Sequence, residues 1–389
     1  MGPCKWRGLV TSVMLVSACY GAMTPKAENI RGFAYYKGKG VPQSFAKAVY
    51  WYRKAAIQGY EAAEDNMGLA YHMGQGVLQN DQKAVYWWRK AATQGYAPAE
   101  DDMGAAYYRG KGVPQSNHKA VYWTRKAAIQ GYAPAEDSMG GAYYRGKGIP
   151  QNFRKAVYWY RKAAIQGFAR ADFGVGRAYY RGQGVPQSFE KAVYWYRKAA
   201  SQGLIKAELN MGLVYIIGLG VPQNDQKAAY WYRKAGAQGN AAADILMGMI
   251  YRDGDGAPKN FQKALDWYRK AAIQGYALAE FRVGRAYNFG QGVHRNDQKA
   301  MYWYRKAAAQ GYAPAEVVMG TSYNLGQGVP KNYVQAYKWF ALAKSATKPG
   351  SKIYSTASSD IKRLSFSMPA PQIAQAQALA YAWVKAHEK

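Results

Sequence analysis

The sequence predicts an all-α solenoid, a stack of helical hairpins built from one unit of 36 residues. Glycine pairs recur with this period, from Gly38 and Gly40 to Gly326 and Gly328, and an Ala-Glu or Ala-Asp pair recurs with it. Tryptophan also recurs at nine positions: Trp51, Trp87, Trp123, Trp159, Trp195, Trp231, Trp267, Trp303 and Trp339. A fixed spacing over nine copies indicates a repeated unit that buries its apolar stripe by stacking on its neighbours.

The second copy shows the two helices of the unit. Small and apolar residues follow a helical period across 62–73, and this helix is expected to end at Gly74, because glycine readily adopts the left-handed C-terminal conformation. Asp81 is expected to N-cap a second helix over 82–94, whose tryptophan fills the space between neighbouring hairpins. In most copies a proline follows the first glycine turn and prevents the first helix from restarting. The unit is therefore predicted to be helix, tight turn, helix, tight turn.

The residues shared by the copies identify a family. They read A-E-x-x-M-G-x-A-Y-x-x-G-x-G-V-P-Q-x-x-x-K-A-V-Y-W-Y-R-K-A-A-x-Q-G, which resembles the Sel1-like repeat, a relative of the tetratricopeptide repeat, over about 27–346. The resemblance implies a right-handed α/α superhelix that serves as a protein-interaction scaffold, with its first helices on the concave face. Many bacterial members are exported and act at the envelope or on host proteins.

The chain is predicted to contain nine repeats and a C-terminal cap. The last repeat has Ala341 and Leu342 where the others have arginine and lysine, so an apolar surface needs a cover. Residues 349–389 are predicted to supply it with two helices, over 353–364 and 371–386. The repeats are assigned to 25–348, as 25–60, 61–96, 97–132, 133–168, 169–204, 205–240, 241–276, 277–312 and 313–348.

Residues 1–22 are predicted to be a leader for export. Lys5 and Arg7 precede an apolar run over 8–18 that is too short for a stable membrane span. The segment Val16-Ser17-Ala18-Cys19 is similar to a bacterial lipobox, in which the cysteine would carry the lipid. Lipidation of Cys19, ordinary signal cleavage and no export remain alternatives. We expect an exported protein, located in the periplasm, in the outer membrane as a lipoprotein, or outside the cell.

The sequence predicts no enzyme, no cofactor and no metal site. Cys4 and Cys19 are the only cysteines, so the repeats hold no disulfide and no thiolate ligand. The cysteine-rich branch of the family, which includes β-lactamase-like members, has a cysteine pair in each repeat, and this chain lacks it. The histidines follow no metal-ligand spacing, and the Gly-x-Gly turns end helices instead of following strands. The row of acidic residues that includes Glu64 is interpreted as capping or bonding between repeats.

Charge is the second informative property of the chain. Lysine and arginine number 53 against 23 aspartates and glutamates, a net charge of +30. An Arg-Lys pair lies near the end of each second helix, from Arg53-Lys54 to Arg305-Lys306, where a cation stabilises the helix dipole. The surplus predicts attraction to acidic partners. Acidic proteins, envelope glycans or lipid head groups fit a leader-bearing chain better than nucleic acid does, since no nucleic-acid-binding signature is present.

A binding site is predicted at variable positions of the first helices in the middle repeats. These positions carry aromatic, arginine and aliphatic side chains, the types in which binding energy concentrates: Tyr108, Arg109, Tyr144, Arg145, Tyr180, Arg181, Ile216 and Ile217. The predicted function is an exported scaffold that binds a host or envelope protein through its concave face. The alternative is a basic surface protein that holds acidic glycans or lipids by charge. The sequence names no partner and no oligomeric state, and leaves open whether these positions drift.

Overall fold

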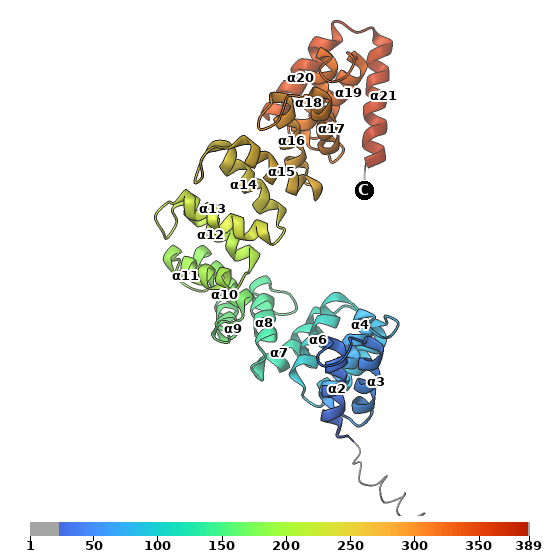
Figure 1. Cartoon of the computed structure of the whole chain (residues 1–389), viewed down its shortest axis with the longest axis vertical. Helices are drawn as coiled ribbons and strands as arrows, with labels where there is room; N and C mark the ends of the chain where they lie inside the picture. Colours follow the sequence, from blue (N-terminus) through green and yellow to red (C-terminus); the bar gives the residue numbers. More distant parts are fainter. Residues whose placement is uncertain (1–22, 388–389) are drawn as a thin grey trace, which may run out of the picture. The chain divides into compact units, whose positions relative to one another are not determined.

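The computed structural model describes residues 23–387, which form twenty α-helices, α2 to α21, and no β-strand within that range (Figure 1). The predicted all-α solenoid is therefore confirmed. The helices fall into two compact units that divide between Ser188 and Phe189. The predicted leader, with Cys19, lies outside the described residues.

First and second helices alternate along the chain. The first helices are α2 (Pro25–Lys37), α4 (Glu61–Met73), α6 (Ala97–Arg109), α8 (Ala133–Arg145), α10 (Ala169–Arg181), α12 (Ile205–Ile217), α14 (Ala241–Asp253), α16 (Ala277–Phe289) and α18 (Ala313–Leu325). The second helices are α3 (Phe45–Ile57), α5 (Asp81–Thr93), α7 (Asn117–Ile129), α9 (Phe153–Ile165), α11 (Phe189–Ser201), α13 (Asp225–Ala237), α15 (Phe261–Ile273), α17 (Asp297–Ala308) and α19 (Tyr333–Ser345).

The helix ends follow the turn chemistry of the sequence, with one correction. Gly74 ends α4 with φ 68°, in the left-handed region that favours glycine. The N-cap of α5 is Asn80, whose Oδ1 accepts a hydrogen bond of 2.9 Å from the backbone N–H of Lys83. The prediction that Asp81 is the cap is wrong by one residue. Asn80 has the extended backbone that a cap requires, whereas Asp81 is already helical.

A glycine in the middle of a first helix lets the second helix of the same hairpin approach closely. A Cβ added at Gly140 would lie 2.5 Å from Cδ1 of Tyr160, and one added at Gly320 would lie 2.7 Å from Cδ1 of Phe340. Both aromatic side chains are at least 95% buried, with exposures of 5% for Tyr160 and 1% for Phe340. The glycine therefore removes the side chain that would block the main aromatic residue of the hairpin core.

The tryptophans themselves are less buried than predicted. The eight from Trp51 to Trp303 are only partly buried, whereas the residue that follows Trp51, Tyr52, is 3% exposed. Adjacent helical positions are about 100° apart, so only one of the two can face the glycine of its own hairpin. The tryptophans do lie between hairpins as predicted, since Trp87 and Trp123 pack against the cores of the preceding hairpins, but the expectation that the row is fully buried is wrong for these eight.

Two further helices cover the end of the second unit. α20 (Lys352–Ser365) and α21 (Ala370–His387) follow the last repeat, and Ala376 and Ala380 of α21 are buried (Figure 1). The ring of Trp383 meets that of Trp339 edge-on, with 5.1 Å between centroids. Trp339 and Leu342 are only 4% and 3% exposed as a result.

Candidate functional site

In six of the first helices, a buried glutamate joins the helix to the second helix of its own hairpin. Gln94 Nε2 donates a hydrogen bond of 2.6 Å to Glu64 Oε2, and Lys90 Nζ lies 2.9 Å from Glu64 Oε1. A buried carboxylate needs such partners, because burial removes its hydration. The same pairings hold Glu28, Glu100, Glu136, Glu208 and Glu280. The acidic residues of this row therefore form bonds, as the sequence suggested, but each bond joins two helices of the same repeat and does not join neighbouring repeats.

Several arginines of the second helices bond to a tyrosine of the next repeat. Arg161 Nη2 donates a hydrogen bond of 2.6 Å to Tyr179 Oη, and Arg269 Nη2 donates one of 2.9 Å to Tyr287 Oη. The lysine beside each arginine also lies against a tryptophan, with Lys90 Nζ 5.0 Å from the Trp87 ring centroid. Many of the arginines and lysines near the ends of the second helices therefore make contacts within the protein. The helix dipole alone does not explain their placement.

The variable positions of the first helices form an acidic surface and an aromatic and cationic surface in the first unit, and an apolar pair in the second unit. In the first unit, four carboxyl groups lie on α4, α6 and α8: Asp65, Asp101, Asp102 and Asp137. Burial, with a smaller contribution from Asp102, raises the pKa of Asp65 to about 8. Burial and the neighbouring Asp101 raise the pKa of Asp102 to about 7, and burial raises that of Asp101 to about 6. This acidic cluster carries much less charge near neutral pH than its composition suggests.

One edge of the acidic cluster is neutralised by a cation. Arg170 Nη2 lies 3.2 Å from Asp137 Oδ2, whereas Asp65 Oδ1 is buried with no hydrogen-bond partner. Within residues 23–387, no group of three or more histidine, cysteine, aspartate or glutamate side chains could hold a metal ion. The site predicted from the sequence did not include these aspartates.

The aromatic and cationic surface contains two residues that were predicted from the sequence, Tyr144 and Arg181. Arg181 Nη1 donates a hydrogen bond of 2.8 Å to Tyr144 Oη, which donates one of 2.7 Å to Gln183 Oε1. The guanidinium of Arg177, which sequence reasoning missed, lies 4.0 Å from the Tyr144 ring centroid. Adjacent repeats thus build one cluster of aromatic and cationic groups. Arg177 could have been found from the sequence, because only one other repeat has an arginine at the equivalent position of its first helix.

The other predicted residues lie around this cluster or in the second unit. Tyr108 is 38% exposed, with Lys147 Nζ 5.6 Å from its ring centroid. Arg109 and Arg145 are exposed, and Tyr180 is partly buried. Ile217 is 52% exposed and Ile216 is partly buried, both on α12 in the second unit. The predicted residues therefore form a set of six in the first unit and a pair in the second.

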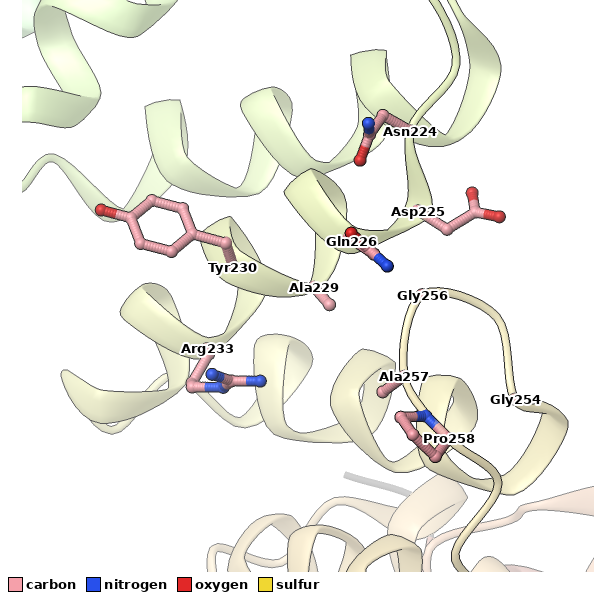
Figure 2. Close-up of a pocket in the computed structure, with 10 residues that line it drawn as sticks. All are labelled: Asn224, Asp225, Gln226, Ala229, Tyr230, Arg233, Gly254, Gly256, Ala257 and Pro258. Carbon is pink, nitrogen blue, oxygen red and sulfur yellow. The ribbon is translucent and has the colours of Figure 1, made fainter.

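A pocket also lies beside one of the second helices, α13. It measures about 730 Å³ and lies between α13 and the turn that follows α14 (Figure 2). Figure 2 shows Tyr230 directed away from that turn, on the opposite side of α13 from Asp225. A Cβ at Gly256 would contact the Asp225 carbonyl, and the equivalent glycines in other repeats make the same approach, so the pocket follows from repeat packing.

None of the helices in residues 23–387 is long and apolar enough to cross a membrane.

Comparison with known proteins assigns the fold to a family. The Sel1 repeat model matches residues 25–60, 62–96, 97–132, 133–168, 169–204, 205–240, 241–276, 277–312 and 313–347. None of the curated proteins compared matches the chain.

Two solved structures extend this assignment along most of the chain. One is c5321, described as a protective antigen present in uropathogenic Escherichia coli strains. It is 32% identical, covers 93% of this chain and 84% of its own, and has a TM-score of 0.53. The other is a Sel1 repeat protein from Oxalobacter formigenes, 29% identical over 88% of this chain and 95% of its own, with a TM-score of 0.62. With nine matched repeats and these neighbours, the chain belongs to the Sel1 repeat family.

Proposed function

We propose that this protein is an exported, non-enzymatic scaffold that binds a host or envelope protein through its first-helix face. Sel1 repeats are generally non-catalytic and generally bind protein partners. Export is proposed from the leader pattern over 1–22 and from the similarity to c5321, which is described as a protective antigen.

The main support for the proposal is a difference between the surface of the second helices and the surface of the first helices. On the second helices, many of the recurrent charged residues bond internally, as Lys90 does with Glu64 and Arg161 with Tyr179. On the first helices, the residues at equivalent positions differ between repeats and many are exposed, such as Arg145 and Ile217. A surface that varies while the packing stays constant fits selective recognition.

The alternative, binding of acidic polymers by charge, is less well supported. It depends on the basic band of the second helices, and that band is partly neutralised by buried carboxylates. Lys126 Nζ, for example, lies 3.0 Å from Glu100 Oε1. Such a lysine offers less charge to a polymer than its place near the surface suggests.

A pull-down with matched variants tests the proposal. The first-helix variant combines Arg145→Glu, Arg181→Glu and Ile217→Asp. Its control combines Arg89→Glu, Arg154→Glu and Ile273→Asp, all exposed on second helices. We expect the first-helix variant to lose its partner from host or envelope fractions, while the control and the wild type retain it. Equal loss in both variants, together with a steep dependence on salt, would support polymer binding instead.

A further inference from the structure

A cavity of about 370 Å³ lies between the seventh and eighth repeats, within the second unit. Three arginines line it, Arg252 from α14 and Arg282 and Arg285 from α16, together with Tyr268 from α15. No carboxylate is among its lining residues. Two helices therefore bring three guanidinium groups to one cavity, and a third helix supplies the tyrosine.

The same cavity recurs between the first two repeats with a different lining. There it measures about 160 Å³ and is lined by Tyr36, Asn66 and Leu69. These three residues occupy the positions of Arg252, Arg282 and Arg285, six repeat lengths earlier in the chain. In the sequence, arginine fills all three positions together only in the seventh and eighth repeats. The cavity thus belongs to the repeat architecture, and its positive charge is specific to this pair.

Several polar groups at the arginine-lined cavity lack a partner. Tyr268 is only 3% exposed, and its hydroxyl makes no hydrogen bond. Arg282 Nε is also buried without a hydrogen-bond partner. Burial and the nearby Arg252 lower the pKa of Arg282, so the three cations repel one another at close range. An unsatisfied buried group costs about 1–3 kcal/mol, and a bound anion would relieve both penalties.

One of the three cations is partly compensated by the protein. Arg252 donates hydrogen bonds of 2.7 and 2.5 Å to the two carboxylate oxygens of Asp253. No ion pair is recorded for Arg282 or Arg285 among the described residues. Arg285 lies 5.4 Å from the Phe289 ring centroid. The cavity therefore keeps an excess of positive charge.

We propose that this cavity binds a carboxylate group on an acidic segment of the protein partner. The planar guanidinium fork matches a carboxylate in a bidentate geometry. Phe261 and Leu265 also line the cavity and offer apolar contact to the methylene groups of a glutamate side chain. At roughly 30 Å³ per water molecule, the volume is enough for such a side chain. This inference rests on the proposed function, because it assigns one chemical determinant of the partner.

Binding of a labelled acidic peptide to the full-length protein tests the proposal directly. The probe is a fluorescein-labelled peptide with four glutamates, compared with its glutamine counterpart by fluorescence anisotropy at about 0.15 M salt. The cavity variant is Arg252→Tyr, Arg282→Asn and Arg285→Leu, which installs the residues that line the first cavity. The control removes the same charge elsewhere, with Arg89→Gln, Arg154→Gln and Arg305→Gln.

We expect the cavity variant to weaken glutamate-peptide binding about tenfold and the control to weaken it less than about twofold. Equal weakening by both variants, or equal binding of the glutamine peptide, would overturn the assignment. Cavity-dependent binding of inorganic phosphate that displaces the peptide would also overturn it in favour of a phosphate site. If the triple variant does not fold by circular dichroism, Arg285→Leu alone, with Arg305→Leu as its control, decides the question.

The peptide assay is independent of the pull-down. Peptide binding that requires the arginines, with no protein retained by the first-helix face, would refute the proposed function and leave the cavity assignment intact. A partner retained by that face, with no peptide binding, would refute the cavity assignment alone.

Discussion

Lys126 Nζ lies 3.0 Å from Oε1 of Glu100, a carboxylate that is fully buried between α6 and α7. Gln130 Nε2 donates a hydrogen bond of 2.7 Å to the other oxygen of the same carboxylate. A lysine that looks like one member of a surface band is therefore the counter-ion of a core group. The positive charge of Lys126 therefore stabilises the folded hairpin by pairing with Glu100.

We predict that Lys126→Met destabilises the first unit by about 1–3 kcal/mol, because Glu100 loses its cation while it stays buried. Thermal unfolding followed by circular dichroism measures the effect. Lys111→Met, at an exposed lysine, is the control and should change stability by less than about 0.5 kcal/mol. If the two variants unfold alike, the ion pair does not contribute to stability.

We predict that Glu316→Gln stabilises the second unit near pH 8. Glu316 is 3% exposed, and Leu342 and Ala346 stand where the other repeats place the partner lysine and glutamine. Burial raises its pKa to about 7, so its contribution to stability is lost as pH rises from about 4.5 through 7. The wild type should therefore unfold at a lower temperature at pH 8 than at pH 5.5, and Glu316→Gln should reduce that difference.

The same substitution one repeat earlier should act in the opposite direction. Glu280 is paired with Lys306 at 3.3 Å and accepts a hydrogen bond of 2.7 Å from Gln310. Glu280→Gln removes the charge that Lys306 needs and is expected to lower stability at pH 8. A stabilising effect at Glu280 would show that the pairing is unimportant.

We predict that the acidic cluster makes the first unit less stable at alkaline pH. Burial and then Asp102 raise the pKa of Asp65 to about 8, so the stabilisation from its neutral form is lost as pH rises from about 4 through 8. Asp65→Asn should raise stability at pH 9 by at least about 1 kcal/mol and change it little at pH 5. Asp255→Asn, at an exposed position in the second unit, should show no such pH dependence.

We predict that residues 1–30, fused to a reporter, carry it across the cytoplasmic membrane. A positive segment followed by a short apolar run is the layout of a secretory signal. If Cys19 is lipidated, Cys19→Ser should release the mature protein from the membrane fraction, measured by fractionation and immunoblotting. A reporter that stays in the cytoplasm would contradict export.

The period of the sequence was enough to predict the helices and turns of the repeat. It could not decide which of two adjacent aromatic residues is buried, since Trp51 and Tyr52 are both large and both recur. The buried residue of the two is the one that packs against Gly32 of the first helix. That residue is Tyr52, because a Cβ added at Gly32 would lie 2.6 Å from Cδ1 of Tyr52. The cap at Asn80 instead of Asp81 has a similar origin, because both side chains can accept the capping hydrogen bond.

The site was predictable only in part. Tyr144 and Arg181 lie at variable positions of the first helices, and this variation together with their residue types was enough to predict them as site residues. Arg252, Arg282 and Arg285 lie on two helices and at three different positions of the repeat, so no comparison of equivalent positions brings them together. Their convergence follows from the packing of one hairpin on the next.

The bond from Arg161 to Tyr179 joins consecutive repeats, and Arg125 bonds to Tyr143 in the same way one junction earlier. Because these junctions are alike, an in-frame deletion of one complete repeat from the gene would rejoin surfaces that already match. The number of repeats can therefore change without the need for a new kind of junction. Such an event would shorten or lengthen the proposed binding surface in a single step, with no new core to evolve.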